Sequence, residues 1–158
     1  MILIKEIELD DKQIQNLNNL VLKETVKVTN LKDMKSTPDI IGSGKDLISL
    51  ESENEIKIVR VRNSIDILKP KIYACFLKAG RAPYSYKMKL GNWSSILLLI
   101  LVLLNLFSIS NTAISKDHQS YPIFIFALLI FLFLMHSETK ITDRYIKDAF
   151  EKLNKKSL

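Results

Sequence analysis

Two long stretches without charge dominate the second half of the chain. No Asp, Glu, Lys or Arg occurs in residues 90–115, and a second charge-free run covers residues 118–137, with only Lys116 and Asp117 between them. At 1.5 Å per residue the two runs correspond to helices of roughly 39 and 30 Å, and the hydrocarbon core of a bilayer is about 30 Å thick. These lengths predict a helical hairpin that crosses a membrane twice.

The composition inside the runs supports this prediction. Residues 96–107 are apolar except for Asn105, and residues 123–135 are apolar without exception. Both stretches are therefore apolar on every side, whereas a helix on a globular surface keeps a polar face. The alternative is a buried hairpin in a soluble core, but a chain of 158 residues could hardly enclose two such helices. We expect spans at about 93–112 and 120–137.

Residues suited to the membrane–water interface flank both runs. Trp and Tyr favour the headgroup layer, and Lys near the end of a span can extend its ammonium group outwards. The candidates for interface anchors are Lys87, Lys89, Trp93, Tyr121 and Lys140.

The basic residues predict an orientation. Six Lys or Arg and no acid occur in residues 69–89, and six more follow Ser137, whereas the loop between the runs holds only Lys116. The positive-inside rule then places both termini in the cytoplasm, and we expect a multi-pass protein of the bacterial inner membrane. The basic band before the first span should also attract anionic lipid headgroups.

The distribution of charge argues against a nucleic-acid partner. Residues 1–68 carry 10 basic and 12 acidic side chains, so the net charge of +6 comes from the band next to the membrane and from the C-terminal tail. Nucleic-acid binding usually needs a basic face on the folded domain itself.

The N-terminal region reads as a mixture of strands and helices. Residues 2–9 are predicted to form a strand, and Asp10 or Asp11 can cap a helix over 11–22. A strand over 25–29 is favoured next because of its β-branched residues, with one long continuous helix as the alternative. The further expected elements are a loop over 34–44, strands at 47–50 and 55–62, a short strand at 65–68, and a helix that starts at Pro70, carries Ile72, Tyr73, Phe76 and Leu77, and ends at Gly80.

No catalytic or cofactor motif is present in the sequence. Gly44-Lys45 suggests a phosphate-binding loop, but that motif needs a glycine where Asp39 stands and a Ser or Thr where Asp46 stands. The single Cys75 excludes an internal disulfide, and the only two histidines are expected at or across the membrane. We therefore expect no catalytic residue, no cofactor and no metal, and not an enzyme.

The first span contains one polar face. Asn105, Ser108 and Thr112 are spaced i, i+3, i+7 and so share one side of a helix. A polar side chain in lipid needs a hydrogen-bond partner, so this face is predicted to pack against another helix. The alternative is that it lines a pore in an oligomer.

The tail after the second span is predicted to be an amphipathic helix. Its apolar stripe consists of Ile141, Tyr145, Ile146, Phe150 and Leu153, with Ala149 on the same side. Such a helix cannot bury its stripe alone. It could continue the second span into the cytosol, pack on the soluble domain, or form a bundle with copies of itself.

Together these features predict a small cytosolic α+β domain (1–80), a basic juxtamembrane linker (81–92), an all-α two-helix transmembrane hairpin (93–137) and an amphipathic C-terminal helix (138–158). The expected function is non-enzymatic: the domain mediates protein binding or self-assembly, as a homo-oligomer or in a membrane protein complex, and the hairpin anchors it. The alternative is an oligomeric membrane effector or channel gated by the domain, because the layout is similar to that of small two-span bacterial effectors.

Overall fold

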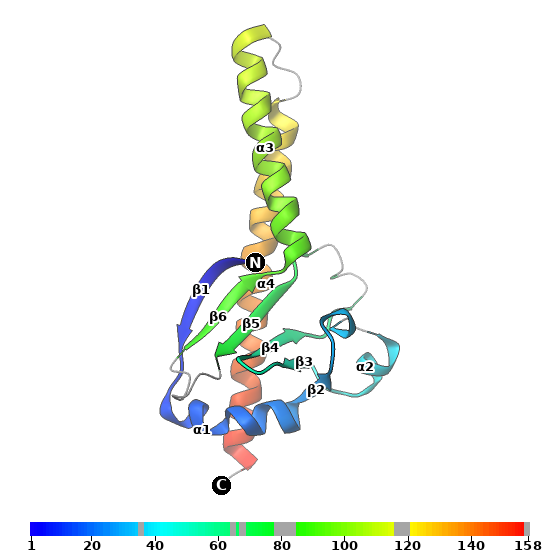
Figure 1. Cartoon of the computed structure of the whole chain (residues 1–158), viewed down its shortest axis with the longest axis vertical. Coiled ribbons are helices and arrows are strands. Elements are labelled where there is room, and N and C mark those ends of the chain that lie inside the picture. The colour runs from blue at the N-terminus through cyan, green and yellow to red at the C-terminus, as the bar shows by residue number, and fades with distance from the viewer. Residues whose placement is uncertain (35–36, 64–65, 67–68, 78–84, 116–120, 157–158) are drawn as a thin grey trace.

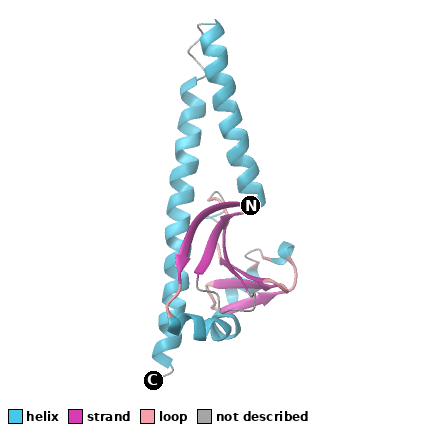
Figure 2. Ribbon diagram, turned by 60° about the vertical axis from the view of Figure 1, so that its left-hand side comes forward, coloured by secondary structure: helices cyan, strands magenta, loops and turns pink. Residues whose placement is uncertain are grey.

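The computed structural model of the chain describes residues 1–34, 37–63, 66, 69–77, 85–115 and 121–156. A single sheet with short helices at its edges forms one end of the molecule, and two long helices project from it side by side (Figure 1). One of these helices runs on past the sheet to the opposite end of the molecule (Figure 2).

The sheet is mixed and has six strands in the order β1-β6-β5-β4-β3-β2. Its strands are β1 (Ile2–Glu8), β2 (Thr25–Val28), β3 (Leu47–Glu51), β4 (Glu55–Arg60), β5 (Ile72–Leu77) and β6 (Ser85–Leu90). Only β2 and β3 pair in parallel, and all the other neighbours are antiparallel. The strands predicted near residues 2–9, 25–29, 47–50 and 55–62 are thereby confirmed.

The connection from β1 to β2 is helical, as predicted. Asp10 accepts a hydrogen bond from the Gln13 backbone N–H, and the Gln13 side chain accepts one from the Asp10 N–H, a reciprocal cap that starts α1 (Asp11–Asn19). One wider turn, η1 (Leu20–Glu24), leads into β2, so the alternative of one long helix is wrong. Thr25 ends the helical segment in extended conformation, and its hydroxyl donates to the Val21 carbonyl.

Two predictions for residues 70–92 are wrong. The expected helix from Pro70 is strand β5, and the expected linker 81–92 contains strand β6. In β5 one face carries Ile72, Ala74 and Phe76 and the other carries Tyr73 and Cys75, all of them buried, so the two-residue period disappears from the sequence. The folded domain therefore extends to Leu90 rather than to residue 80.

The segment before β3 differs slightly from the expected loop. After the short turn η2 (Leu31–Asp33), Thr37 caps a five-residue helix, α2 (Pro38–Gly42), and Gly44 follows with a positive φ of 69°. The short strand expected at 65–68 lies outside the described residues except for Asp66.

The two long helices are α3 (Asn92–Ser115) and α4 (Tyr121–Lys156). The predicted tail helix is the second half of α4, with no break at residue 138. The hydrophobic core lies between this half of α4 and one face of the sheet, and it includes Ile146 and Phe150 of α4 together with Phe76 and Met88 of the sheet. A smaller cluster around Met34, Ile48 and Tyr73 fills the other face under η2 and α2.

Candidate functional site

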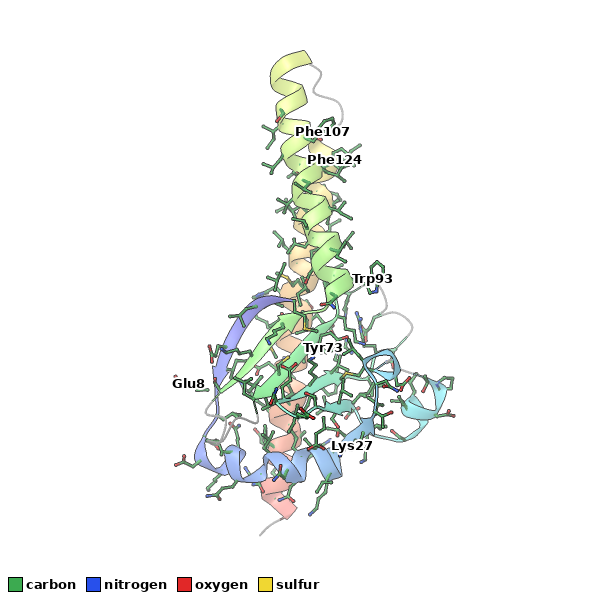
Figure 3. All side chains as sticks on the ribbon, in the orientation of Figure 1. Glu8, Lys27, Tyr73, Trp93, Phe107 and Phe124 are labelled. Carbon is green, nitrogen blue, oxygen red and sulfur yellow. The ribbon has the colours of Figure 1, made fainter. Side chains whose placement is uncertain are left out.

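The outer surface of the helical hairpin is apolar and exposed. Trp93 is 85% exposed, Phe133 71% and Phe107 64%, and most neighbouring Leu and Ile side chains on both helices are also exposed. Both helices are long and apolar enough to cross a membrane, the first over Asn92–Ser110 and the second starting at Ile123. Figure 3 shows side chains projecting to both the left and the right of this pair along its length.

The polar face of α3 is turned toward α4. Asn105 and Ser108 are 7% and 6% exposed, and the Asn105 amide donates to the Leu101 carbonyl at 2.7 Å and to the Phe124 carbonyl of α4 at 3.0 Å. This geometry is of the kind that helix packing requires, because the amide has hydrogen-bond partners inside one hairpin. The Thr112 side chain lies outside the described residues.

The predicted interface anchors fall in different settings. Trp93 projects from the first turn of α3 at the base of the hairpin (Figure 3), and Lys140 is exposed on α4. Lys87 and Lys89, however, belong to β6, where their ammonium groups lie 3.8 Å from Glu6 and Glu55 respectively. Their ion pairs within the sheet were not expected from the sequence. The Tyr121 side chain lies outside the described residues.

A close backbone approach joins α3 to the sheet. The Gly91 N–H donates to the Lys71 carbonyl at 2.8 Å, and the Lys71 N–H donates to the Ser94 hydroxyl at 3.0 Å. A Cβ at Gly91 would lie 3.0 Å from the Tyr73 ring and 3.2 Å from the Lys71 carbonyl oxygen. A side chain at this position would therefore force the Tyr73 ring or the Lys71 backbone to move by a few tenths of an ångström.

A buried ion pair joins α4 to the sheet just below the apolar part of that helix. Arg60 on β4 and Glu138 on α4 have side chains only 6% and 2% exposed, and two parallel hydrogen bonds of 2.7 and 2.8 Å connect them. The Arg60 guanidinium also reaches Asp66 at 2.8 Å, and Asp66 lies 2.7 Å from the Lys69 ammonium. We call Arg60, Glu138 and Asp66 the junction.

Electrostatics favour the charged state of the junction. Burial lowers the pKa of Arg60, but hydrogen bonds and charge from Glu138 and Asp66 outweigh that effect and hold it above its usual range. Hydrogen bonds from Arg60 and Lys69 hold the pKa of Asp66 well below its usual range. No local pattern in the sequence pairs these residues, because 78 positions separate Arg60 from Glu138.

The apolar stripe of the tail is covered by the sheet and α1. Ile146, Phe150 and Leu153 are buried, whereas Ile141 and Tyr145 are half-buried. Two polar contacts fix the same surface: the Tyr86 hydroxyl donates to Asp143 at 2.5 Å, and the Asn16 amide donates to Asn154 at 2.8 Å. Burial, followed by the hydrogen bond to Asp143, raises the pKa of Tyr86 far above its usual value.

Three features of the domain bear on possible chemistry: a groove, the single cysteine and the arrangement of the acidic side chains. A groove of about 290 Å³ beside α4 is lined by both acids and lysines, among them Asp46, Asp148 and Lys152. Cys75 is buried, and burial raises the pKa of its thiol, which disfavours the nucleophilic thiolate. Among the described residues, no three His, Cys, Asp or Glu side chains gather in a group that could hold a metal ion. Comparisons with protein-family models, curated proteins and solved structures found no match.

Proposed function

We propose that this chain is a two-span integral membrane protein that acts without catalysis, as an anchored module whose sheet domain binds a protein partner or further copies of the chain. The observation that carries the proposal is the exposed apolar surface of the hairpin. Each large apolar side chain left in water forgoes roughly 1.5–3 kcal/mol of burial, and 17 such side chains are exposed on the described parts of these two helices. A bilayer would cover all of them at once.

The packing of the domain supports a topology with both termini on one side. The strand β1 and the last turns of α4 belong to the same folded unit, so the hairpin must leave and re-enter this unit on one face of the membrane. The basic residues are concentrated on that side, and the positive-inside rule then makes it the cytoplasm.

The continuity of α4 supports a coupled anchor rather than a loose tether. A flexible linker would let domain and hairpin move independently, whereas α4 passes from one to the other without interruption, held by the junction and by the Tyr86–Asp143 hydrogen bond. A partner that shifts α4 at the sheet would therefore also shift it in the membrane.

Single-cysteine labelling tests insertion and topology together. In a Cys75→Ala background, we would introduce Ser120→Cys, at a position between the two helices in the sequence, and Leu22→Cys on η1, where Leu22 is 69% exposed. A membrane-impermeant maleimide should label position 120 in intact cells and position 22 only after the membrane is opened. Equal labelling of both in intact cells, or release of the protein by alkaline carbonate, would contradict the proposal.

The binding role has its own test. We would determine the mass of the protein in nanodiscs and identify proteins that copurify with it from its native membrane. A defined homo-oligomer or a stoichiometric partner supports the module. A monomer without any companion would contradict it.

The alternative of an oligomeric channel has less structural support. Asn105 and Ser108, the residues expected to line a pore, face α4 within one hairpin. Planar-bilayer recordings decide between the two: discrete conductance steps that Asn105→Leu abolishes without affecting assembly would favour the channel and overturn the anchored module.

A further inference from the structure

We infer that the first residues of β1, Ile2 and Leu3, form a third contact with the bilayer, a shallow one at the headgroup boundary next to the base of the hairpin. This inference rests on the proposed function, since it needs α3 and α4 to be in the membrane. The predicted membrane contact then includes a strand as well as the two helices that the sequence composition indicates.

The register of the sheet sets the level of these residues. Ile2 pairs with Leu90 and Leu3 with Lys89, and α3 begins at Asn92, only two residues beyond Leu90. The start of β1 therefore lies at the height where the first span begins. Figures 1 and 2, which differ by a 60° rotation, both show the N-terminus at the base of α3.

These residues are exposed although they are apolar. Ile2 is 44% and Leu3 53% exposed, and because neighbours in a strand point to opposite faces, both faces of this end of β1 are uncovered. The pairing register shifts between Leu3 and Lys5, and Ile4, by contrast, is partly buried against the core. An edge strand in water is usually protected by charge, so two consecutive exposed apolar residues at its end need a covering partner.

The polarity of β1 changes along its length in the direction that a bilayer would require. The apolar residues are at the hairpin end, and the charged Lys5, Glu6 and Glu8 follow toward the other end, where Figure 3 labels Glu8. The same order holds in α4, which is apolar from Ile123 up to Met135 and charged from Glu138. Trp93, at the same level, is the type of side chain that favours the headgroup layer.

A second copy of the chain, paired antiparallel along β1, is a poorer occupant. Antiparallel pairing of two β1 edges would run their strands in opposite directions, and the two hairpins would then point away from each other. Both could not enter one flat membrane from one side. The headgroup boundary of a bilayer fits both the position of Ile2 and Leu3 at the base of the hairpin and the change from apolar to charged residues along β1.

Depth-dependent quenching of tryptophan fluorescence tests the inference, because Trp93 is the only tryptophan. In a Trp93→Phe background the full chain would carry Ile2→Trp, with Leu103→Trp in the first span as the positive control and Leu22→Trp on η1 as the negative control. The protein is reconstituted into phosphatidylcholine–phosphatidylglycerol vesicles that contain brominated phosphatidylcholine.

We expect Ile2→Trp to be quenched about half as strongly as Leu103→Trp, as for an aromatic ring at headgroup level, and Leu22→Trp not to be quenched. Quenching of Leu103→Trp without quenching of Ile2→Trp would overturn the inference and leave the two-span anchor intact. Absence of quenching at Leu103→Trp would instead overturn the anchor itself.

A second measurement tests whether the introduced tryptophan itself causes the insertion. In a Cys75→Ala background, Leu3→Cys should react several-fold more slowly with a charged maleimide than Leu22→Cys in the same vesicles. Equal rates would contradict the contact. Protection of Leu3→Cys that disappears when the protein is diluted to one copy per vesicle would point to a second chain and would also overturn it.

Discussion

The two halves of α4 have the same backbone geometry and opposite surroundings. In the first half, Ile123, Phe126 and Phe133 are each about two-thirds exposed or more, whereas in the second half Ile146 and Phe150 are almost completely buried. The first half is apolar all round, and the second has one apolar stripe with charges on its other sides. A helix with one apolar face can bury that face against a single sheet. A helix that is apolar on every side can be buried only by surroundings that cover it all round.

The largest expected difference between the two halves of α4 is in how much the free energy of unfolding falls when an aromatic side chain is replaced by alanine. Phe150→Ala should lower the free energy of unfolding of the sheet domain by about 4 kcal/mol, because it leaves a cavity in the core between α4 and the sheet. Phe133→Ala on the other half should change it by less than about 0.5 kcal/mol. Urea unfolding in nanodiscs, followed by circular dichroism, measures both, and equal effects would refute the division of α4.

The boundary between the halves should be nearly as sensitive. Glu138→Gln is expected to cost about 3 kcal/mol, because the buried Arg60 guanidinium loses its two parallel hydrogen bonds to a carboxylate and keeps only Asp66 as a counter-charge. The double variant Arg60→Met/Glu138→Met should recover most of that loss, since it removes both charges together. Glu151→Gln, an exposed change on the same helix, serves as the control; a loss in the double variant as large as in Glu138→Gln would contradict this explanation.

The junction should also make the domain sensitive to acid. Because the pKa of Asp66 is lower in the folded chain than in the unfolded one, its stabilising effect is complete above about pH 4, the ordinary value, and decreases as the pH falls below it. Asp66→Asn should therefore cost about 1–2 kcal/mol at pH 7, near the lower end because solvent screens part of the interaction, and progressively less below pH 4. Unfolding at several pH values, with Glu53→Gln as an exposed control, measures this; a difference that does not change with pH would exclude Asp66 as its source.

The smallest effect is expected inside the hairpin. Asn105→Leu removes the hydrogen bond to the Phe124 carbonyl and should weaken the association of α3 with α4 by about 0.6–1 kcal/mol, because the alternative state in lipid also finds partners for the amide. Ser110→Ala is the matched control, since its hydroxyl bonds to the Leu106 carbonyl within α3. Unfolding in mixed micelles measures both, and a loss of several kcal/mol in Asn105→Leu would show that this amide does more than pack two helices.

The sequence predicted the helices and strands whose hydrophobic pattern reflects burial on one face only, or on every side of a long helix. The strands near residues 2–9 and 47–62, the helix capped at Asp10 and both long apolar helices follow from local periodicity and capping. The prediction for residues 70–80 is wrong because β5 is covered on both faces, so that its apolar run also fits a helix. In β6, Lys87 and Lys89 alternate with Tyr86, Met88 and Leu90, and such a mixture of lysines and aromatic residues also fits a membrane-interface segment.

The candidate sites divide in the same way. The shared face of Asn105 and Ser108 could be predicted, since residues three apart on one helix are neighbours whatever surrounds them. The pairing of Arg60 with Glu138 could not, because 78 positions separate them and only the packing of α4 on β4 brings them together.

By itself, the sequence determined that two helical segments, residues 96–107 and 123–135, are apolar on nearly every side. It also determined that the C-terminal segment has one apolar stripe, which needs a partner. The length of an apolar run, the period of its hydrophobic residues and the distribution of charge depend only on residues close in the sequence. They can therefore be read before the chain folds. The tertiary structure alone decided that the partner is the chain's own sheet, that one helix joins both regions without a break, and that Ile2 lies beside the start of α3. Those facts depend on contacts between distant segments, which form only when the sheet order and register are set.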